Sequence, residues 1–218
     1  MDAYVTLLEE AILQYVGLPV LERLKTDPVN ALKLNRQPID ATILFTDLRS
    51  FSGLLEKFPI DILLDDLNVY FGRMSEIILR HHGFVDSLNG DAICAIFGIS
   101  NSNHADDACS AAIECLESLS EFNIGRDMRF KFEMGIGINS GKVLLGNIGS
   151  KHKLQFTASG HMVNLASRME GLTKKYQCNV VMTELTKKLL TIDLRTKELD
   201  RVSVTGLQGQ LILYSLQP

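Results

Sequence analysis

Two apolar runs that each end in an aspartate constrain the fold of this chain more than any other feature. Residues 41–47 (Ala-Thr-Ile-Leu-Phe-Thr-Asp) have the composition of a buried strand and turn through residues 48–50 into Phe51. Residues 84–89 and 92–98 flank an Asn-Gly-Asp tip that ends at Asp91, which predicts a β-hairpin. Taken singly, each aspartate is better explained as an ordinary strand-end or turn residue.

As a pair, Asp47 and Asp91 suit divalent cations, because hard cations prefer oxygen ligands. Two such side chains on neighbouring strand ends can hold two Mg²⁺ ions about 3.5 to 4 Å apart, an arrangement used for in-line attack at phosphorus. The pair is therefore a candidate site for phosphate chemistry.

Composition limits the class of protein. The chain has 218 residues, 46% of them hydrophobic, so we expect a single domain with one sizeable core behind a short N-terminal extension. The formal net charge is −4 and the basic residues are dispersed, which argues against a nucleic-acid partner. The four cysteines form no C-x-x-C pair and lie in apolar surroundings, so we interpret them as core thiols of a protein in a reducing cytoplasm.

The chain is expected neither to span a membrane nor to carry a signal peptide. No run of about 18 apolar residues occurs. The N-terminus carries acidic residues where a signal peptide would have basic ones.

The hydrophobic pattern predicts helices alternating with strands. Residues 2–24 have helical spacing broken at Gly17 and Pro19, which predicts two short helices, followed by a polar linker over residues 25–37. A long helix is expected to start with Pro59 at its first position and to stop before Gly83. A second long helix is expected over residues 104–122 with Asn103 as N-cap, so that the His-Ala-Asp-Asp run is a helix start and not a metal cluster.

The second half predicts further strands around the same sheet. Residues 129–139 read as a strand, and residues 142–157 as a hairpin that turns through residues 146–149. A helix over 161–177, a strand over 179–182, a short helix over 183–190 and a strand-turn-strand over 194–216 follow. This order predicts an α+β fold with a ferredoxin-like βαββαβ core, related to the palm topology of polymerases, and C-terminal additions.

Five motifs occur in one order and together resemble the class III adenylyl/guanylyl cyclase catalytic domain, from about Ile39 to Pro218. They are Phe-Thr-Asp-Leu-Arg-Ser-Phe-Ser (45–52), Asn-Gly-Asp-Ala (89–92) with Phe-Gly (97–98), Gly-Ile-Gly-Ile-Asn-Ser-Gly (135–141), Gly-Asn-Ile-Gly-Ser (146–150) and Val-Asn-Leu-Ala-Ser-Arg-Met-Glu (163–170). The resemblance implies that the hairpin after residue 142 reaches a partner subunit in a homodimer.

The resemblance also implies roles for individual residues. Asp47 and Asp91 would bind two Mg²⁺ or Mn²⁺ ions, with the backbone carbonyl of Leu48 as a further ligand. Asn164 would orient the ribose, and Arg168, four residues later on the same helix face, would receive charge that develops on phosphorus. The substrate's phosphate oxygens would be received by the turn of Arg49, Ser50, Phe51 and Ser52, with the Arg49 side chain itself in solvent.

The chain departs from the family pattern at the nucleobase and phosphate positions. Members that use ATP usually carry Lys at the position of Ser87 and Asp or Thr at the position of Thr157, whereas members that use GTP carry Glu with Cys or a small residue. The chain therefore meets half of the adenine pattern and none of the guanine pattern. His161 stands where Asp is common, and Val-Thr-Gly-Leu (204–207) replaces a Val-Lys-Gly-Lys segment that supplies phosphate-binding charge.

The leading hypothesis is a homodimeric cyclase that converts ATP to 3′,5′-cyclic AMP, formed by residues 39–218 behind a helical coupling segment and linker over residues 1–38 that could follow an upstream sensor. The alternatives are a guanylate cyclase that uses GTP, and a weak or silent cyclase-like module that dimerises and binds nucleotide. A diguanylate cyclase is excluded, because residues 88–92 lack its Gly-Gly-Asp/Glu-Glu-Phe turn.

Overall fold

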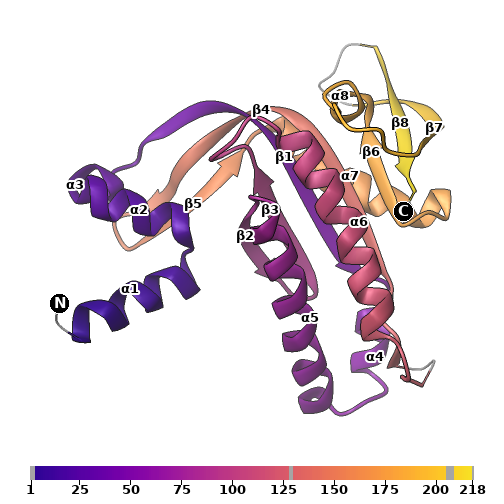
Figure 1. The fold of residues 1–218 in the computed structure, drawn as a ribbon, viewed down its shortest axis with the longest axis horizontal. Helices are drawn as coiled ribbons and strands as arrows, with labels where there is room; N and C mark the ends of the chain where they lie inside the picture. The colour runs from indigo at the N-terminus through magenta and orange to yellow at the C-terminus, as the bar shows by residue number, and fades with distance from the viewer. Residues whose placement is uncertain (1–2, 128–129, 205–208, 218) are drawn as a thin grey trace.

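One eight-stranded sheet forms the centre of the molecule in the computed structural model, which describes residues 3–127, 130–204 and 209–217 (Figure 1). The strand order is β2-β3-β1-β4-β6-β8-β7, and β5 pairs with β4 outside this path. The strands are β1 (Arg36–Leu48), β2 (Phe84–Asn89), β3 (Ala92–Phe97), β4 (Met134–Ser150), β5 (Lys153–Ser159), β6 (Val180–Thr183), β7 (Thr196–Ser203) and β8 (Gln210–Leu216).

The first four strands and two long helices form the predicted βαββαβ core. Its order along the chain is β1, α5 (Ile60–Arg80), β2, β3, α6 (His104–Phe122) and β4, and every neighbouring pair of these strands is antiparallel. Helix α7 (His161–Tyr176) then crosses over to β6, which lies parallel to β4. The structure confirms the predicted fold class.

The central strands are buried on both faces, which explains their nearly continuous apolar composition. Leu44 of β1 belongs to the core beneath α5 and α6, whereas the adjacent Ile43 belongs to a second core that includes Ala166 of α7. This alternation places the two long helices on one face of the sheet and α7 on the other.

Helices α5 and α6 follow the sequence pattern closely. Pro59 is the N-cap of α5, one position earlier than predicted, and Ile60 and Leu64 of the predicted apolar stripe are exposed while Tyr70 and Ile77 are buried. Asn103 holds the N-cap position of α6 but makes no capping hydrogen bond. Thus the helix bounds followed from the spacing, but the details of burial did not.

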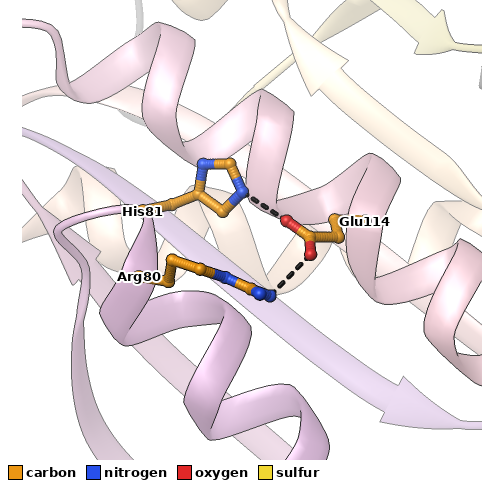
Figure 2. A network of polar contacts seen from close by, with 3 residues as sticks. All are labelled: Arg80, His81 and Glu114. Atoms are coloured by element: carbon orange, nitrogen blue, oxygen red, sulfur yellow. Dashed lines mark hydrogen bonds and ion pairs between the residues drawn. The ribbon is translucent and has the colours of Figure 1, made fainter.

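Surface contacts join the two long helices. Arg80 and His81, at the end of α5, both contact Glu114 of α6, at 2.5 Å and 2.7 Å (Figure 2). Because Arg80 is exposed and the other two side chains are partly exposed, we expect the cluster to add little to stability. The cluster lies on the face of the sheet that α5 and α6 cover, opposite α7.

Strand β4 corrects the predicted hairpin. The strand runs without interruption from Met134 to Ser150 and turns only at residues 151–152, so the glycines at 146 and 149 lie inside a strand. A Cβ atom at Gly146 would collide with the carbonyl of Asn35, and one at Gly149 with that of Lys153. These glycines therefore permit close backbone approach where the sequence suggested a turn. Residue 129 of the predicted strand at 129–139 lies outside the described residues.

The N-terminal segment forms α1 (Ala3–Tyr15), α2 (Leu18–Thr26) and a short α3 (Pro28–Ala31) inside the predicted linker. The predicted break falls at Gly17, whose φ of +93° favours glycine, and a Cβ atom there would collide with the Phe84 ring. The guanidinium of Arg23 stacks over the Phe156 ring at 4.8 Å. Helix α1 has no buried residue and extends beyond the sheet (Figure 1).

In the described residues, no helix is both long enough and apolar enough to cross a bilayer.

Two more short helices complete the described elements. Helix α4 (Phe51–Leu55) follows β1, and α8 (Glu184–Lys187) follows β6. The buried carboxylate of Asp106 in α6 accepts hydrogen bonds from the N–H of Thr191, at 2.9 Å, and from its hydroxyl. Asp106 therefore anchors the segment after α8, a contact that sequence reasoning did not predict.

Candidate active site

Asp47 and Asp91 lie together at one end of the sheet. Asp47 is near the end of β1, opposite Gly135 of β4, and Asp91 follows Gly90 at the tip of the β2–β3 hairpin. The Leu48 N–H donates to Oδ2 of Asp91 at 3.1 Å, which joins the two strand ends. Gly90 has a φ of +64°, the left-handed conformation that the predicted Asn-Gly turn requires.

The two carboxyl groups repel each other. Burial raises the pKa of Asp91, and hydrogen bonding to Asp47 and the charge of Asp47 raise it further, to about 6. In the described part of the chain no cluster of three or more His, Cys, Asp or Glu residues could hold a metal ion, so any cation would rely on these two acids and backbone or substrate oxygens. An all-oxygen donor set with excess negative charge fits Mg²⁺ or Mn²⁺.

The residues beneath the acidic pair are tightly packed. Thr46 and Tyr70 are fully buried next to it, and their hydroxyls lie 3.2 Å apart. Burial raises the pKa of the Tyr70 phenol, so this group stays protonated. The side chain of Leu48 is buried in the core, which leaves only its backbone to face the acids. Asp47 is therefore carried on a strand, and Asp91 on the tip of a hairpin, next to these packed residues.

Helix α7 approaches β4 closely because the strand has glycines there. A Cβ atom at Gly137 would collide with the backbone of Ala166 and Glu170, and one at Gly135 with the side chains of Thr173 and Glu170. The Gly-x-Gly motif thus sets the distance between helix and sheet.

Asn164 and Arg168 share the exposed face of α7, as their spacing predicts. The buried face of the helix holds Leu165, Ala166, Met169 and Thr173. Arg168 lines a surface pocket of about 370 Å³ with residues of α7 and with Val202, Ser203 and Val204. Within one chain the structure brings Asp47 and Asp91 together but shows no contact of either acid with Asn164 or Arg168 in the described residues. The other three residues of the segment at 204–207 lie outside the described ones.

Glu170 is a residue that sequence reasoning missed. Its pKa is raised, first by burial and then by the charge of Asp47, with Asp91 adding to the shift. Its Oε1 and the Thr173 Oγ1 are buried without a hydrogen-bond partner in the described structure. Glu170 is thus a third carboxyl group in the electrostatic field of the pair. The sequence signal that could have identified Glu170 is its position at the end of the motif at residues 163–170.

The turn after β1 differs from its prediction in the position of the Arg49 side chain and in the number of backbone amides left for phosphate. Arg49 is not in solvent, because its Nη2 donates to the Cys178 carbonyl at 2.9 Å. Its backbone N–H donates to the Glu133 carbonyl at 2.7 Å and so is already used. Of the predicted phosphate-binding turn, the amides of Ser50, Phe51 and Ser52 remain, at the start of the five-residue helix α4. The Phe51 side chain is buried in the core.

The structure places Ser87 and Thr157 near a shared acid. Ser87 lies on β2 opposite Cys94, and Thr157 lies on β5 opposite Gly146. Burial raises the pKa of the Asp86 carboxyl, and interactions with Thr157 and Ser87 partly offset this shift. In a regular strand, neighbouring residues such as Asp86 and Ser87 point to opposite faces of the sheet. Their grouping depends on the register shift of β2 between residues 85 and 87, which the sequence spacing alone does not show. His161 begins α7, and its Nε2 is buried with no partner in the described structure.

The comparisons with known proteins agree on one family. The model of the adenylate and guanylate cyclase catalytic domain matches residues 35–218. The terminal-differentiation-specific adenylate cyclase of Dictyostelium discoideum is 35% identical over 179 residues, 80% of this chain. An adenylate cyclase of Anabaena cylindrica is 40% identical over 150 residues, 66% of this chain.

A solved structure of a bacterial light-regulated adenylyl cyclase covers 98% of this chain and 62% of that one, with a TM-score of 0.86 and 26% identity. The present chain spans only 8% of the length of the Dictyostelium protein and 29% of that of the Anabaena protein. The similarity therefore concerns one domain of longer proteins. The family model extends over most of the chain and the fold agrees with it, so the chain belongs to the adenylate and guanylate cyclase catalytic domain family.

Proposed function

We propose that this chain is a nucleotide cyclase that converts ATP to 3′,5′-cyclic AMP and pyrophosphate in a homodimer. One observation carries the proposal: Asp47 and Asp91 converge at the sheet end, where burial, a hydrogen bond to Asp47 and the charge of Asp47 raise the pKa of Asp91 to about 6. Such a pair is stabilised by cations and is costly without them. The relatives from Dictyostelium and Anabaena, both named adenylate cyclase, support ATP as the substrate.

Each residue has a role in this proposal. Asp47, Asp91 and the Leu48 carbonyl would hold two Mg²⁺ or Mn²⁺ ions, which would supply positive charge to the ribose 3′-hydroxyl and the triphosphate. The amides of Ser50, Phe51 and Ser52 orient phosphate oxygens. Arg168 donates to the oxygens of the reacting phosphate, where its planar fork matches the developing charge, and Asn164 holds the ribose.

The site is proposed to be shared between two subunits. Asn164 and Arg168 point away from the core of their own chain, and no described contact joins them to the two aspartates. A second copy related by a two-fold axis would bring its α7 to the acids of the first. Residues 1–38 are proposed to be a coupling segment, because α1 has no buried residue and the light-regulated cyclase is matched over 98% of this chain. An upstream sensor and a cytoplasmic location belong to the same proposal.

Two alternative functions are each supported by a specific observation. Ser87 supplies no charge to a nucleobase, which favours weak activity or a silent regulatory module. The same hydroxyl, with Thr157, can accept as well as donate hydrogen bonds, which favours some use of GTP.

The deciding experiment incubates the purified chain with ATP and with GTP, each with Mg²⁺ and with Mn²⁺, and measures cyclic nucleotide by chromatography. Cyclic AMP formed faster than cyclic GMP supports the proposal. Predominant cyclic GMP identifies a guanylate cyclase. Nucleotide binding without either product identifies the regulatory module.

A further inference from the structure

Glu170 on α7 has one carboxyl oxygen buried without a partner. Within the described residues, its Oε1 and the Oγ1 of Thr173 are both enclosed by the protein and make no hydrogen bond. A buried carboxyl oxygen that lacks a partner is costly, so such a group calls for an explanation. The buried face of α7 consists of Leu165, Ala166, Met169 and Thr173, so the packing of this helix does not require a carboxylate at position 170.

The strand register places this oxygen beside Asp47. Gly135 of β4 pairs with Asp47 of β1, and residues paired across antiparallel strands project to the same face of the sheet with their Cβ atoms about 5 Å apart. A Cβ atom at Gly135 would stand 2.6 Å from Glu170 Oε1. Glu170 Oε1 therefore occupies the place of the missing cross-strand neighbour of Asp47, within about 8 Å of the Asp47 Cβ atom.

Separate contacts put Asp47 on the face of the sheet that α7 covers. Thr46, directly before it, points to the other face, where its hydroxyl lies 3.2 Å from that of Tyr70 of α5. Phe45 packs against the core that contains Ala166 of α7. Side chains alternate along a strand, so Asp47 shares the face of Phe45. This is the face from which α7 presents its acid.

The electrostatics agree with this geometry. Burial raises the pKa of Glu170 most, followed by the charge of Asp47. The charge of Asp91 adds to the shift, and those of Lys174 and Arg49 oppose it. No three acids of the described ranges are placed to hold one ion directly, so Glu170 is not a direct ligand. A carboxylate outside the direct ligands still acts on a cation, because its negative charge favours the occupied site.

We propose, on the basis of the function proposed above, that Glu170 is a positioning residue of the cation site: an outer carboxylate on α7 that completes a field of three acids around the ions that Asp47 and Asp91 would hold. Two divalent ions carry more positive charge than two carboxylates neutralise, so a third acid on the same face is favourable when they are bound. Gly135 has no side chain because one would displace this acid.

The variant Glu170→Gln tests the role, because it removes the charge and keeps the size of the side chain. Mn²⁺ is titrated into the purified chain without nucleotide at pH 8, and free Mn²⁺ is followed by electron paramagnetic resonance. The dissociation constant should rise by about tenfold, as expected for an outer acid of a metal site. Glu170→Ala, a second loss of the charge, should give a similar rise, and Asp47→Asn should abolish binding. Thermal melts in chelator confirm that each variant is folded.

Three further variants separate the charge from the packing over Gly135. Glu170→Asp keeps the charge and should keep the dissociation constant within about threefold of the parent value. Thr173→Val removes the other unpartnered oxygen from the same contact, without a change of charge, and should alter the constant by less than about twofold. Glu114→Gln removes an acid on the opposite face of the sheet and should change nothing.

An unchanged dissociation constant in Glu170→Gln would overturn the inference, as would an equal loss of affinity in Thr173→Val, since packing and not charge would then set the affinity. A parent that binds no Mn²⁺ would overturn it together with the two-metal assignment. Cyclase activity is measured separately. A parent that makes cyclic AMP but whose Mn²⁺ affinity does not depend on Glu170 would refute this inference alone. The expected loss in Glu170→Gln with a parent that turns over neither ATP nor GTP would support the cation site and contradict the cyclase.

Discussion

The backbone N–H of Leu48 donates a hydrogen bond to Oδ2 of Asp91 at 3.1 Å, although the two residues lie 43 positions apart in the sequence. The bond fixes one carboxylate oxygen at the end of β1, next to Asp47, and leaves the other for a ligand. The acidic pair is thus held by the backbone, and its spacing does not depend on flexible side chains alone.

Replacing either acid should abolish turnover. Each carboxylate would bridge ions whose charge the triphosphate requires, so Asp47→Ala and Asp91→Ala should lose activity by at least about a thousandfold. Mn²⁺ should support faster turnover than Mg²⁺, because a site without lysine at position 87 relies more on its ions. Cyclic AMP formation by purified variants measures both effects, with Glu114→Gln as the matched loss of an acid. Activity of Asp47→Ala near that of the parent would exclude the two-metal assignment.

The metal-free protein should gain stability from Asp91 as the pH falls from 7 through 6 to about 5. The folded-state pKa of Asp91 is raised to about 6 from 3.8, so between these values the folded state holds a proton that the unfolded state has lost. The penalty is present at pH 7 and is relieved as the pH falls through 6. Asp91→Asn should therefore stabilise the metal-free chain by about 1 kcal/mol at pH 7, after allowance for solvent screening.

Thermal melts in chelator at pH 7 and pH 5 check this. The gain of Asp91→Asn should shrink at pH 5, where the parent carboxyl is protonated, and should reverse when Mn²⁺ is added at pH 7, since only the parent binds it. A destabilised Asp91→Asn at pH 7 would contradict the repulsion inferred for the pair.

Two inactive variants should rescue each other. If the acids of one subunit face Asn164 and Arg168 of its partner, a mixed dimer of Asp47→Ala and Arg168→Ala chains contains one site with both acids and the arginine. Mixing should recover up to about a quarter of the parental activity, from half of the dimers with one of two sites. Subunit exchange is verified first with differently tagged chains. Exchange without recovery would show that the site lies within one chain.

Ser87→Lys should raise the preference for ATP. A lysine there donates a charged hydrogen bond to adenine N1, which guanine cannot accept at that position, and one such bond of about 1.5 kcal/mol corresponds to roughly tenfold in relative kcat/KM. Steady-state kinetics with both nucleotides measures it, with Ser118→Lys on α6 as the control for added charge. A parent that already discriminates by more than about a thousandfold would mean that another group reads the base.

Deleting residues 1–26 should weaken dimerisation or change the turnover rate while leaving the sheet intact. Helix α1 exposes Tyr4, Leu7 and Tyr15 and buries none of its residues, so it gains from a partner surface. Sedimentation velocity and cyclase assays compare the two chains, and circular dichroism confirms the fold. If both mass and rate stay the same, the helices are packing elements of their own domain.

Much of the fold could be read from the sequence because its signals are local. The spacing of apolar residues gave α6 at its observed bounds, and the Asn-Gly tip gave the β2–β3 hairpin. The turn at residues 146–149 was wrong, because glycine marks close backbone approach as well as turns and only the tertiary partner, here the carbonyl of Asn35, distinguishes them.

The candidate site shows the same division. Asp47 and Asp91 were recognised because each ends a strand, a local property. Glu170 and Asp86 were missed because their surroundings come from elsewhere: a glycine of β4 admits Glu170 beside Asp47, and a bulge in β2 takes Asp86 out of the regular strand pairing. The predicted solvation of Arg49 failed because its acceptor, the Cys178 carbonyl, lies 129 residues away.

The absence of a side chain at Gly17 lets the joint between α1 and α2 rest on the ring of Phe84, and Arg23 of α2 rests on Phe156. Phe84 begins β2, which carries Ser87, and Phe156 directly precedes Thr157 in β5. The centres of the two rings lie 6.1 Å apart. A rotation of the helix pair would therefore displace the strands that carry Ser87 and Thr157 before it reached Asp47 and Asp91. Regulation through this segment would then be seen as altered nucleotide affinity, with the chemical step of bound substrate left largely as it was.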